Sequence, residues 1–173
     1  MEKSEAQRAA FTETVDKYPA ASLYYVDECG IDKFIYREYA YAPRGVPVEG
    51  KISGKKFKRT NVIAAKCCGK IVAPMVYGGT TDSVLFEHWF INALLPSIPK
   101  QSVIILDNAS FHRKSRLHDL AMKADCTVLF LPPYSPDLNE IETFWAWLKA
   151  RLRAVLHFFP SFDDALVACF KGV

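Results

Sequence analysis

The sequence contains no long hydrophobic run. Nowhere in its 173 residues does a stretch approach the roughly 20 consecutive apolar residues of a membrane-spanning helix. The first eight residues are mostly charged or polar and lack the apolar centre of a secretory signal peptide. These absences exclude a membrane-spanning helix within this sequence, and we expect a cytoplasmic protein with no membrane partner.

Metal-binding patterns of cysteine and histidine are also missing. The five cysteines include no Cys-x-x-Cys pair, and the four histidines show no metal-ligand spacing relative to them. The pattern therefore argues against a zinc site and against a disulfide framework. We expect reduced, mostly buried thiols.

The chain has little excess charge of either sign, with a formal net charge of +3. Its basic residues are nevertheless unevenly distributed, and several groups of them accompany acidic positions. Such groups are typical of a solvated surface and also of a surface that binds a polyanion, so both interpretations stay open. The candidate DNA contacts among them are Lys51, Lys55, Lys56, Lys58, Arg59, Arg113, Lys149 and Arg153.

Half of the residues are hydrophobic, which is enough for a substantial core in one domain. The sequence predicts a short helix within residues 1–20 and one folded domain over residues 21–173. Apolar runs bounded by turn signals predict four strands, with a turn at Gly69 and Lys70 between the last two. These strands are expected at residues 23–27, 34–41, 61–67 and 71–77.

The second half of the chain alternates strand and helix patterns. Apolar runs predict strands, and helical spacing predicts helices, the first of them capped near Asp82 and ended by Pro96. Strands that alternate with helices pair in parallel, so the whole order predicts an α/β fold: a mixed sheet of three antiparallel strands and then parallel strands, with helices packed against it. That order matches the ribonuclease H-like fold. The elements are strands at 102–106 and 127–131 and helices at 82–96, near 113–123, from Leu138 onward and from Ser161 onward.

Three acidic residues occupy positions that suit a metal site. Asp27 and Asp107 each follow an apolar run, and Glu142 comes just after the proline-containing loop 131–139. Phosphodiester cleavage by two metal ions, about 3.5–4 Å apart, needs carboxylates to hold them. Carboxylates gathered without cations would repel one another. If the fold brings these three acids together, the sequence predicts a site for two Mg²⁺ or Mn²⁺ ions.

Each acid also has a purely structural interpretation. Asp27 fits a turn residue before Gly30. Asp107 with Asn108 fits an Asx turn, and Glu142 fits a first-turn helix residue that is stabilised by the helix dipole. Taken singly, none of the three indicates catalysis.

The segments around these acids resemble the catalytic domain of DDE transposases, in the branch of bacterial insertion sequences related to mariner elements. The matching segments are 26–28, 105–109 with His112, and 131–142 with Trp145. The third contains the highly specific run Pro-Pro-Tyr-Ser-Pro-Asp-Leu-Asn at 132–139.

The resemblance implies that Asp27, Asp107 and Glu142 are catalytic metal ligands, and thirty-four residues separate the second from the third, a recurring spacing in that family. It also implies an enzyme that hydrolyses the phosphodiester at a transposon end and then uses the freed 3′-hydroxyl to attack target DNA. DNA and a dimeric synaptic complex follow as partners. Only about 20 residues precede the first strand, too few for a helix-turn-helix module. We therefore expect either a catalytic fragment of a longer protein, or a DNA-reading part supplied by a separate helix-turn-helix subunit or an upstream reading frame.

One position departs from the family pattern: Glu140 stands where proline is usual. Residues 140 and 142 lie about 200° apart on a helix, so both cannot face the metal ions, and we predict Glu142 as the ligand. Glu140, Glu28 and Asn108 are predicted as supporting groups around the ligands. His112 is predicted as a phosphate contact.

Two other functions stay open. A ribonuclease H-like nuclease would cut DNA without joining it, and an inactive remnant would only bind DNA. The run at 132–139 argues against the first, and the presence of all three acids argues against the second.

Overall fold

A central five-stranded sheet organises the part of the chain that the computed structural model describes, residues 5–32 and 59–171. The strands are β1 (Leu23–Ile31), β2 (Thr60–Cys67), β3 (Lys70–Gly78), β4 (Val103–Leu106) and β5 (Thr127–Phe130). Their order across the sheet is β3-β2-β1-β4-β5. The strand predicted at 34–41 and the lysines at positions 51–58 lie outside the described residues.

Pairing directions confirm the predicted mixed sheet. Strands β1, β2 and β3 pair antiparallel, whereas β1, β4 and β5 pair parallel. Strand β1 therefore lies at the centre and joins the two halves. All four residues of β4 are buried, as expected for a parallel strand that is covered on both faces.

The β2–β3 hairpin turns one residue earlier than predicted. Cys68 and Gly69 both have positive φ angles, 48° and 79°, and form the turn, while Lys70 already belongs to β3. Two consecutive residues with positive φ give a backbone twist that suits a tight hairpin. Glycine adopts this conformation at no steric cost, which explains why the turn falls at Gly69.

The helix predicted from Asp82 is present as three consecutive segments. They are α2 (Ser83–Trp89), the π-helical segment η2 (Phe90–Leu94) and α3 (Leu95–Ser97), so Pro96 lies inside the final turn and does not end the helix. Asp82 caps α2 as predicted, because its side chain accepts a hydrogen bond of 2.8 Å from the Leu85 N–H.

The remaining helices are α1 (Glu5–Val15), α4 (Lys114–Lys123), α5 (Ile141–Val155) and α6 (Phe162–Phe170), with short 3-10 turns η1 (Ala20–Ser22), η3 (Pro136–Leu138) and η4 (Leu156–Phe158). Helix α5 starts three residues later than predicted, because η3 and the extended residue Asn139 precede it. Ser161 caps α6 through a hydrogen bond of 3.1 Å from the Asp164 N–H.

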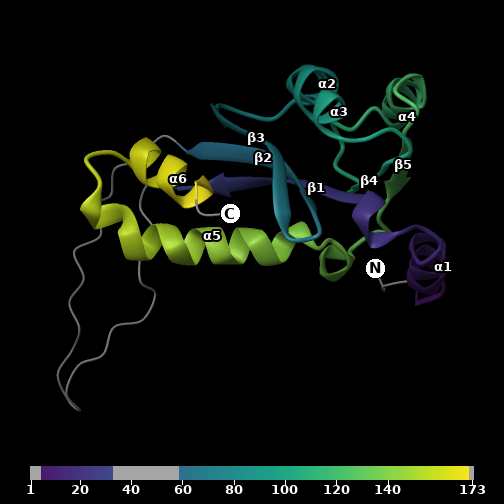
Figure 1. Ribbon diagram of the computed structural model, residues 1–173, viewed down its shortest axis with the longest axis horizontal. Helices are drawn as coiled ribbons and strands as arrows, with labels where there is room; N and C mark the ends of the chain where they lie inside the picture. Colours follow the sequence, from purple (N-terminus) through teal and green to yellow (C-terminus); the bar gives the residue numbers. More distant parts are fainter. Residues whose placement is uncertain (1–4, 33–58, 172–173) are drawn as a thin grey trace, which may run out of the picture.

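Two hydrophobic layers cover the two faces of the sheet. One joins β1 and β4 to α5 and α6, and the other joins them to α2, η2 and α4. Figure 1 shows α5 running along one side of the sheet while α2 and α3 lie on the other. No helix in the described part of the chain combines the length and apolar character that a membrane crossing requires.

Candidate active site

The parallel pairing of β1 with β4 places Asp27 level with Asp107. Tyr25 is the register partner of Ile105, and each acid lies two residues further along its strand. Asp107 directly follows β4, as predicted. Asp27 does not end its strand, because β1 continues to Ile31 in pairing with β2. The prediction of a strand-end position for Asp27 was therefore wrong, although its position beside Asp107 suits a shared site.

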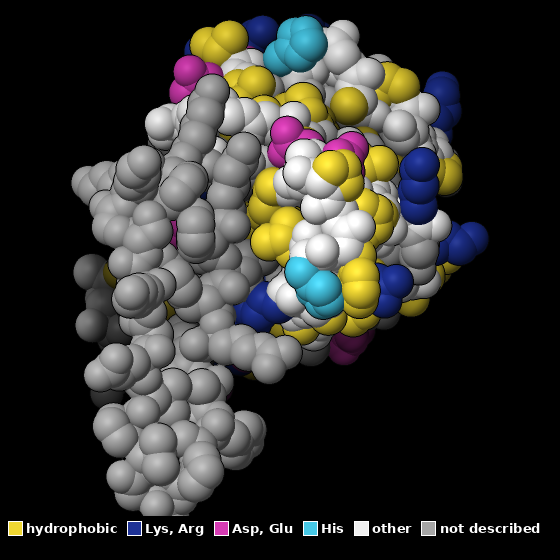
Figure 2. Space-filling view, turned by 90° about the vertical axis from the view of Figure 1, so that its left-hand side faces the viewer, with side chains coloured by type: hydrophobic (Ala, Val, Ile, Leu, Met, Phe, Trp, Pro, Cys, Tyr) yellow, Lys and Arg dark blue, Asp and Glu magenta, His cyan; other side chains and the backbone are white. Residues whose placement is uncertain are grey.

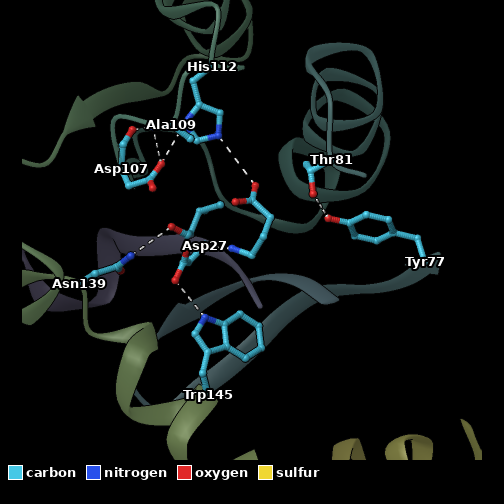
Figure 3. Close-up of polar contacts among 10 residues, drawn as sticks. Asp27, Tyr77, Thr81, Asp107, Ala109, His112, Asn139 and Trp145 are labelled. Carbon is cyan, nitrogen blue, oxygen red and sulfur yellow. Dashed lines mark hydrogen bonds and ion pairs between the residues drawn. The ribbon is translucent and has the colours of Figure 1, made fainter. Parts of the chain in front are cut away.

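Asp27 is a half-buried carboxylate that accepts two hydrogen bonds. Its Oδ1 accepts from the Glu28 N–H at 2.8 Å, and its Oδ2 accepts from Trp145 Nε1 at 3.1 Å (Figure 3). Burial is the largest of the effects that raise the pKa of Asp27 to about 7, and the negative charges of Glu28, Glu142 and Asp107 contribute to the same rise. A cation in the cleft would relieve this repulsion.

Asp107 has the opposite electrostatic setting. Its Oδ1 accepts from the Ala109 N–H at 2.9 Å, which forms an Asx turn, and lies 3.2 Å from Nδ1 of His112. Burial alone would raise the pKa of Asp107, but the contacts with His112 and Ala109 outweigh burial and lower it. Asp107 therefore stays ionised at neutral pH. It both forms the turn and lines the cleft.

His112 lies between two carboxylates and is almost completely buried. Its Nδ1 faces Asp107, and its Nε2 lies 3.8 Å from Oε1 of Glu28 (Figure 3). Burial lowers the pKa of His112, but its contacts with the carboxylates of Asp107 and Glu28 outweigh this effect and raise it to about 9. A protonated His112 thus orients Asp107. The prediction that it contacts phosphate stays a prediction.

Glu142 reaches the site from the first turn of α5 and is exposed. It lines the same cleft as Asp27 and Asp107, a cleft with a volume of about 500 Å³. The loop at 131–136 forms one wall of this cleft, and Asn139 also lines it. Helix α1 braces that loop through an ion pair between Arg8 and Asp137. Three carboxylates from β1, the end of β4 and α5 therefore face one cavity.

The donors in this cleft are of the type that Mg²⁺ and Mn²⁺ prefer. All three carboxylates supply oxygen atoms, and the buried Oδ1 of Asn139 has no hydrogen-bond partner. Across residues 5–32 and 59–171, however, no group of three or more His, Cys, Asp or Glu side chains is arranged to hold a metal ion by itself. The oxygen donors of this cleft fit hard divalent cations in their chemistry. The three carboxylates lie around an open cleft and are not drawn together into a closed metal site.

The predicted supporting residues have distinct contacts. Asn108 donates to the carbonyl of Leu131 and accepts from Lys114, so it ties the end of β4 to the loop wall. Glu28 points to His112. Glu140 is exposed at the N-terminal end of α5, and its backbone carbonyl accepts a hydrogen bond of 2.8 Å from Lys66.

The candidate DNA contacts are spread over several elements. Arg113 is bound to Glu87 of α2 through two hydrogen bonds of 2.6 and 2.7 Å, and Arg59 lies across Gly30 of β1. Lys149 lies near Cys29, and Arg153 is exposed in the last turn of α5. Figure 2 shows Lys and Arg side chains spaced between hydrophobic ones at the end of the molecule formed by α6 and the end of α5. These DNA contacts stay predictions.

Two residues at the site were not predicted as functional. Asn139 is buried, and its Nδ2 donates to the Val26 carbonyl at 3.4 Å, so it fixes the loop against β1. Trp145 was predicted as a core residue, and it is buried, but it also binds Asp27. Trp145 lies three residues after Glu142 and so on the same face of the helix, and this spacing could have indicated that Trp145 belongs to the site.

The same residues match a known family. The chain matches the family of DDE superfamily endonucleases over residues 22–165, which include all three acids. The chain belongs to this family. Among curated proteins, this DDE endonuclease is 34% identical over 73 residues to the uncharacterized protein y4pE/y4sA of Sinorhizobium fredii (strain NBRC 101917 / NGR234). That match covers 39% of this chain and 47% of the relative, so it spans about half the length of the relative.

Solved structures share the fold. The Mos1 transposase paired-end complex with left transposon end superposes with a TM-score of 0.69 at 19% identity, over 100% of this chain and 60% of that one. The Mos1 mariner paired-end complex with Mn gives 0.66 at 19% identity, over 95% and 54% of the two chains. The catalytic core domain of BIV integrase gives 0.51 at 14% identity, over 87% and 81%. The predicted ribonuclease H-like fold is confirmed as the fold of these transposase and integrase cores.

Proposed function

We propose that this DDE endonuclease is the catalytic domain of a bacterial DNA transposase. It hydrolyses a phosphodiester bond at each transposon end and then joins the freed 3′-hydroxyl to target DNA, with two Mg²⁺ or Mn²⁺ ions. The observation that carries the proposal is the convergence of Asp27, Asp107 and Glu142 on one open cleft in a chain of this family. When bound, the ions would activate the attacking oxygen and stabilise the leaving oxygen.

The protein contributes a preformed arrangement of oxygen donors. Strand β1 and the end of β4 hold Asp27 and Asp107 side by side, because their register is fixed by the parallel pairing. His112 keeps Asp107 in one orientation, and Trp145 does the same for Asp27. Such fixed geometry lowers the cost of assembling the reacting groups. The open mouth of the cleft, with Glu142 exposed at its edge, leaves room for a DNA backbone.

The partners of the proposed enzyme are the transposon ends and the target DNA. We also propose that the enzyme acts as a dimer in the synaptic complex. Its DNA-reading part would come from a separate helix-turn-helix subunit or from an upstream reading frame. The Mos1 paired-end complexes, which contain transposon-end DNA, support the DNA partner. A bacterial transposase acts on DNA in the cytoplasm, and that compartment is part of the proposal.

Cleavage and joining test this function directly. The protein is incubated with Mn²⁺, a labelled duplex from the end of the element that encodes it, and a supercoiled plasmid as target. We expect the duplex to be cut and its 3′ end to be joined to the plasmid. Cutting without joining would support the ribonuclease H-like nuclease instead, and DNA binding alone would support the inactive remnant.

Substitution of the acids identifies the residues responsible. Asp107→Asn should abolish cleavage while DNA affinity stays equal or rises, because a negative charge is removed from the cleft. Glu142→Gln should also abolish cleavage, and the matched variant Glu140→Gln should retain it. Cleavage by D107N at the wild-type rate, or greater damage from E140Q than from E142Q, would overturn the assignment of the three ligands.

A further inference from the structure

Lys66 links strand β2 to the helix that carries Glu142. Its Nζ donates to the backbone carbonyl of Glu140 at 2.8 Å and to Oγ1 of Thr143 at 2.9 Å. The Thr143 hydroxyl in turn donates to the same Glu140 carbonyl at 2.8 Å. Lys66 thus binds the residue two positions before Glu142 and the residue directly after it.

The location of this ammonium group needs a physical explanation. The N-terminal end of a helix carries a partial positive charge, so a lysine at that end is electrostatically unfavourable. The hydrogen bonds of Lys66 offset this cost because both acceptors are oxygen atoms fixed by the first turn of α5. Lys66 is half-buried, and Tyr25 is its register partner on β1, two residues before Asp27. The contact therefore joins the central sheet to the first turn of α5.

Helix α5 has no side-chain cap of its own at this end. Glu140 occupies the N-cap position with helical angles, φ −61° and ψ −22°, and its side chain makes no capping hydrogen bond. Glu142 accordingly lies in the first turn of the helix, where N–H groups find partners outside the helix, and its own N–H donates to the Asn139 carbonyl at 3.1 Å. A contact from the sheet to this turn adds to that bond in holding the Glu142 carboxylate toward the cleft.

We propose that Lys66 is a positioning residue that clamps the first turn of α5 and so fixes Glu142 in the cleft. The proposal rests on the proposed function for its catalytic consequence, whereas the clamp itself is a property of the fold. Lys66 need not touch DNA or metal ions to act in this way.

The backbone at Glu140 offers an independent way to restore the clamp. Its φ of −61° is the value that proline imposes, and the preceding residue Asn139 is extended, with φ −97° and ψ 102°, as a residue before proline must be. No hydrogen bond from the Glu140 N–H occurs among the described backbone contacts. Glu140→Pro should therefore stiffen the helix start without strain.

The experiment compares K66M, the double variant K66M/E140P and the matched control K70M, which replaces an exposed lysine of the same hairpin. Hydrogen exchange of the peptide that covers residues 140–146 is the first measurement. We expect exchange in K66M to be about 10-fold or more faster, since hydrogen bonds to a charged group are lost. K70M should match the wild type, and the double variant should regain protection.

Cleavage kinetics are the second measurement. In K66M, kcat should fall by about 10-fold to 100-fold with KM for DNA changed less than about twofold, because positioning rather than DNA binding is lost. The double variant should recover most of kcat. Unchanged exchange in K66M, or a loss of kcat that E140P does not recover, would overturn the proposal. If the wild type cuts no DNA, the proposed function fails, and hydrogen exchange still decides whether the clamp exists.

Discussion

At the scale of single residues, the candidate site combines two carboxylates in opposite electrostatic settings. Asp107 is held ionised by His112, whereas burial and neighbouring acids raise the pKa of Asp27 to about 7. Two adjacent carboxylates with different proton affinities can share a cavity that holds no cation. A divalent cation would remove the difference, because it favours the ionised form of both.

The pKa of Asp27 predicts how stability depends on pH. The folded protein keeps the Asp27 proton up to about pH 7, whereas the unfolded chain releases it near pH 3.8. Asp27 therefore destabilises the folded state progressively as the pH rises from about 4 to 7. Relative to the wild type, Asp27→Asn should gain stability on the order of 2–4 kcal/mol over that range in the absence of divalent ions.

Urea unfolding of both proteins at pH 4, 6 and 8 measures this difference. Addition of Mn²⁺ at pH 8 should raise the Tm of the wild type and leave that of D27N unchanged. A constant stability difference across pH would show that Asp27 is not in the buried, acid-surrounded environment described above.

At the scale of elements, the segment that carries Asp107 is fastened to α2 by an ion-pair cluster. Glu87 is buried in α2, and its two carboxylate oxygens accept from Arg113 and Arg116 at 2.6–2.7 Å. Burial alone would raise the pKa of Glu87, but the two arginines outweigh burial and lower it. The cluster fixes α4 and the preceding loop, and with them His112, against the helix on the same face of the sheet.

Removal of this carboxylate should weaken the whole α2–α4 layer. We expect Glu87→Gln to lower Tm by about 3 °C or more at pH 7, because a buried acceptor of two arginines is lost. The lowered pKa of Glu87 means that its contribution is present above pH 4.5 and disappears as the pH falls further. Calorimetry at pH 7 and pH 3 tests both statements.

The control is Glu13→Gln in α1, where the side chain is exposed and lies 4.0 Å from Lys17. An exposed pair of this kind contributes little, so Tm should stay nearly constant. An equal effect of E87Q and E13Q would show that the α2–α4 contact is no stronger than a surface ion pair.

At the scale of the whole molecule, DNA affinity has to come from local groups of basic residues, because the net charge is only +3. Duplex binding weakens with added salt, with a logarithmic slope of about −0.9 for each phosphate contacted. If Lys51, Lys55, Lys56 and Lys58 contact phosphates, replacing all four by Ala should make the slope shallower by as much as about 3.6.

Fluorescence anisotropy at several salt concentrations measures this slope. The single variant K70A, at the β2–β3 turn, serves as the control and should leave the slope unchanged. An identical slope for the fourfold variant and the wild type would assign the basic segment to ordinary solvated surface.

The sequence by itself predicted most of the described elements and the three acids that line the cleft. Alternating and helical spacing are local patterns, so β2, β3, β4, β5 and α4 lie within one or two residues of their predicted bounds. The acids were found because each belongs to a short contiguous motif. One exception is also local in origin: the 3-10 turn at 136–138 delayed the start of α5, beside the position where proline is replaced by Glu140. The other is not, because β1 continues past Asp27 to Ile31 through its pairing with β2.

Only the tertiary structure decided how these parts meet. The bond from Trp145 to Asp27 joins residues 118 positions apart, and the contact of Lys66 with Glu140 joins residues 74 apart. The burial of His112 between two acids from different strands is of the same kind. Contacts of this type depend on which helix covers which face of the sheet and in which register the strands pair, and no local periodicity encodes either.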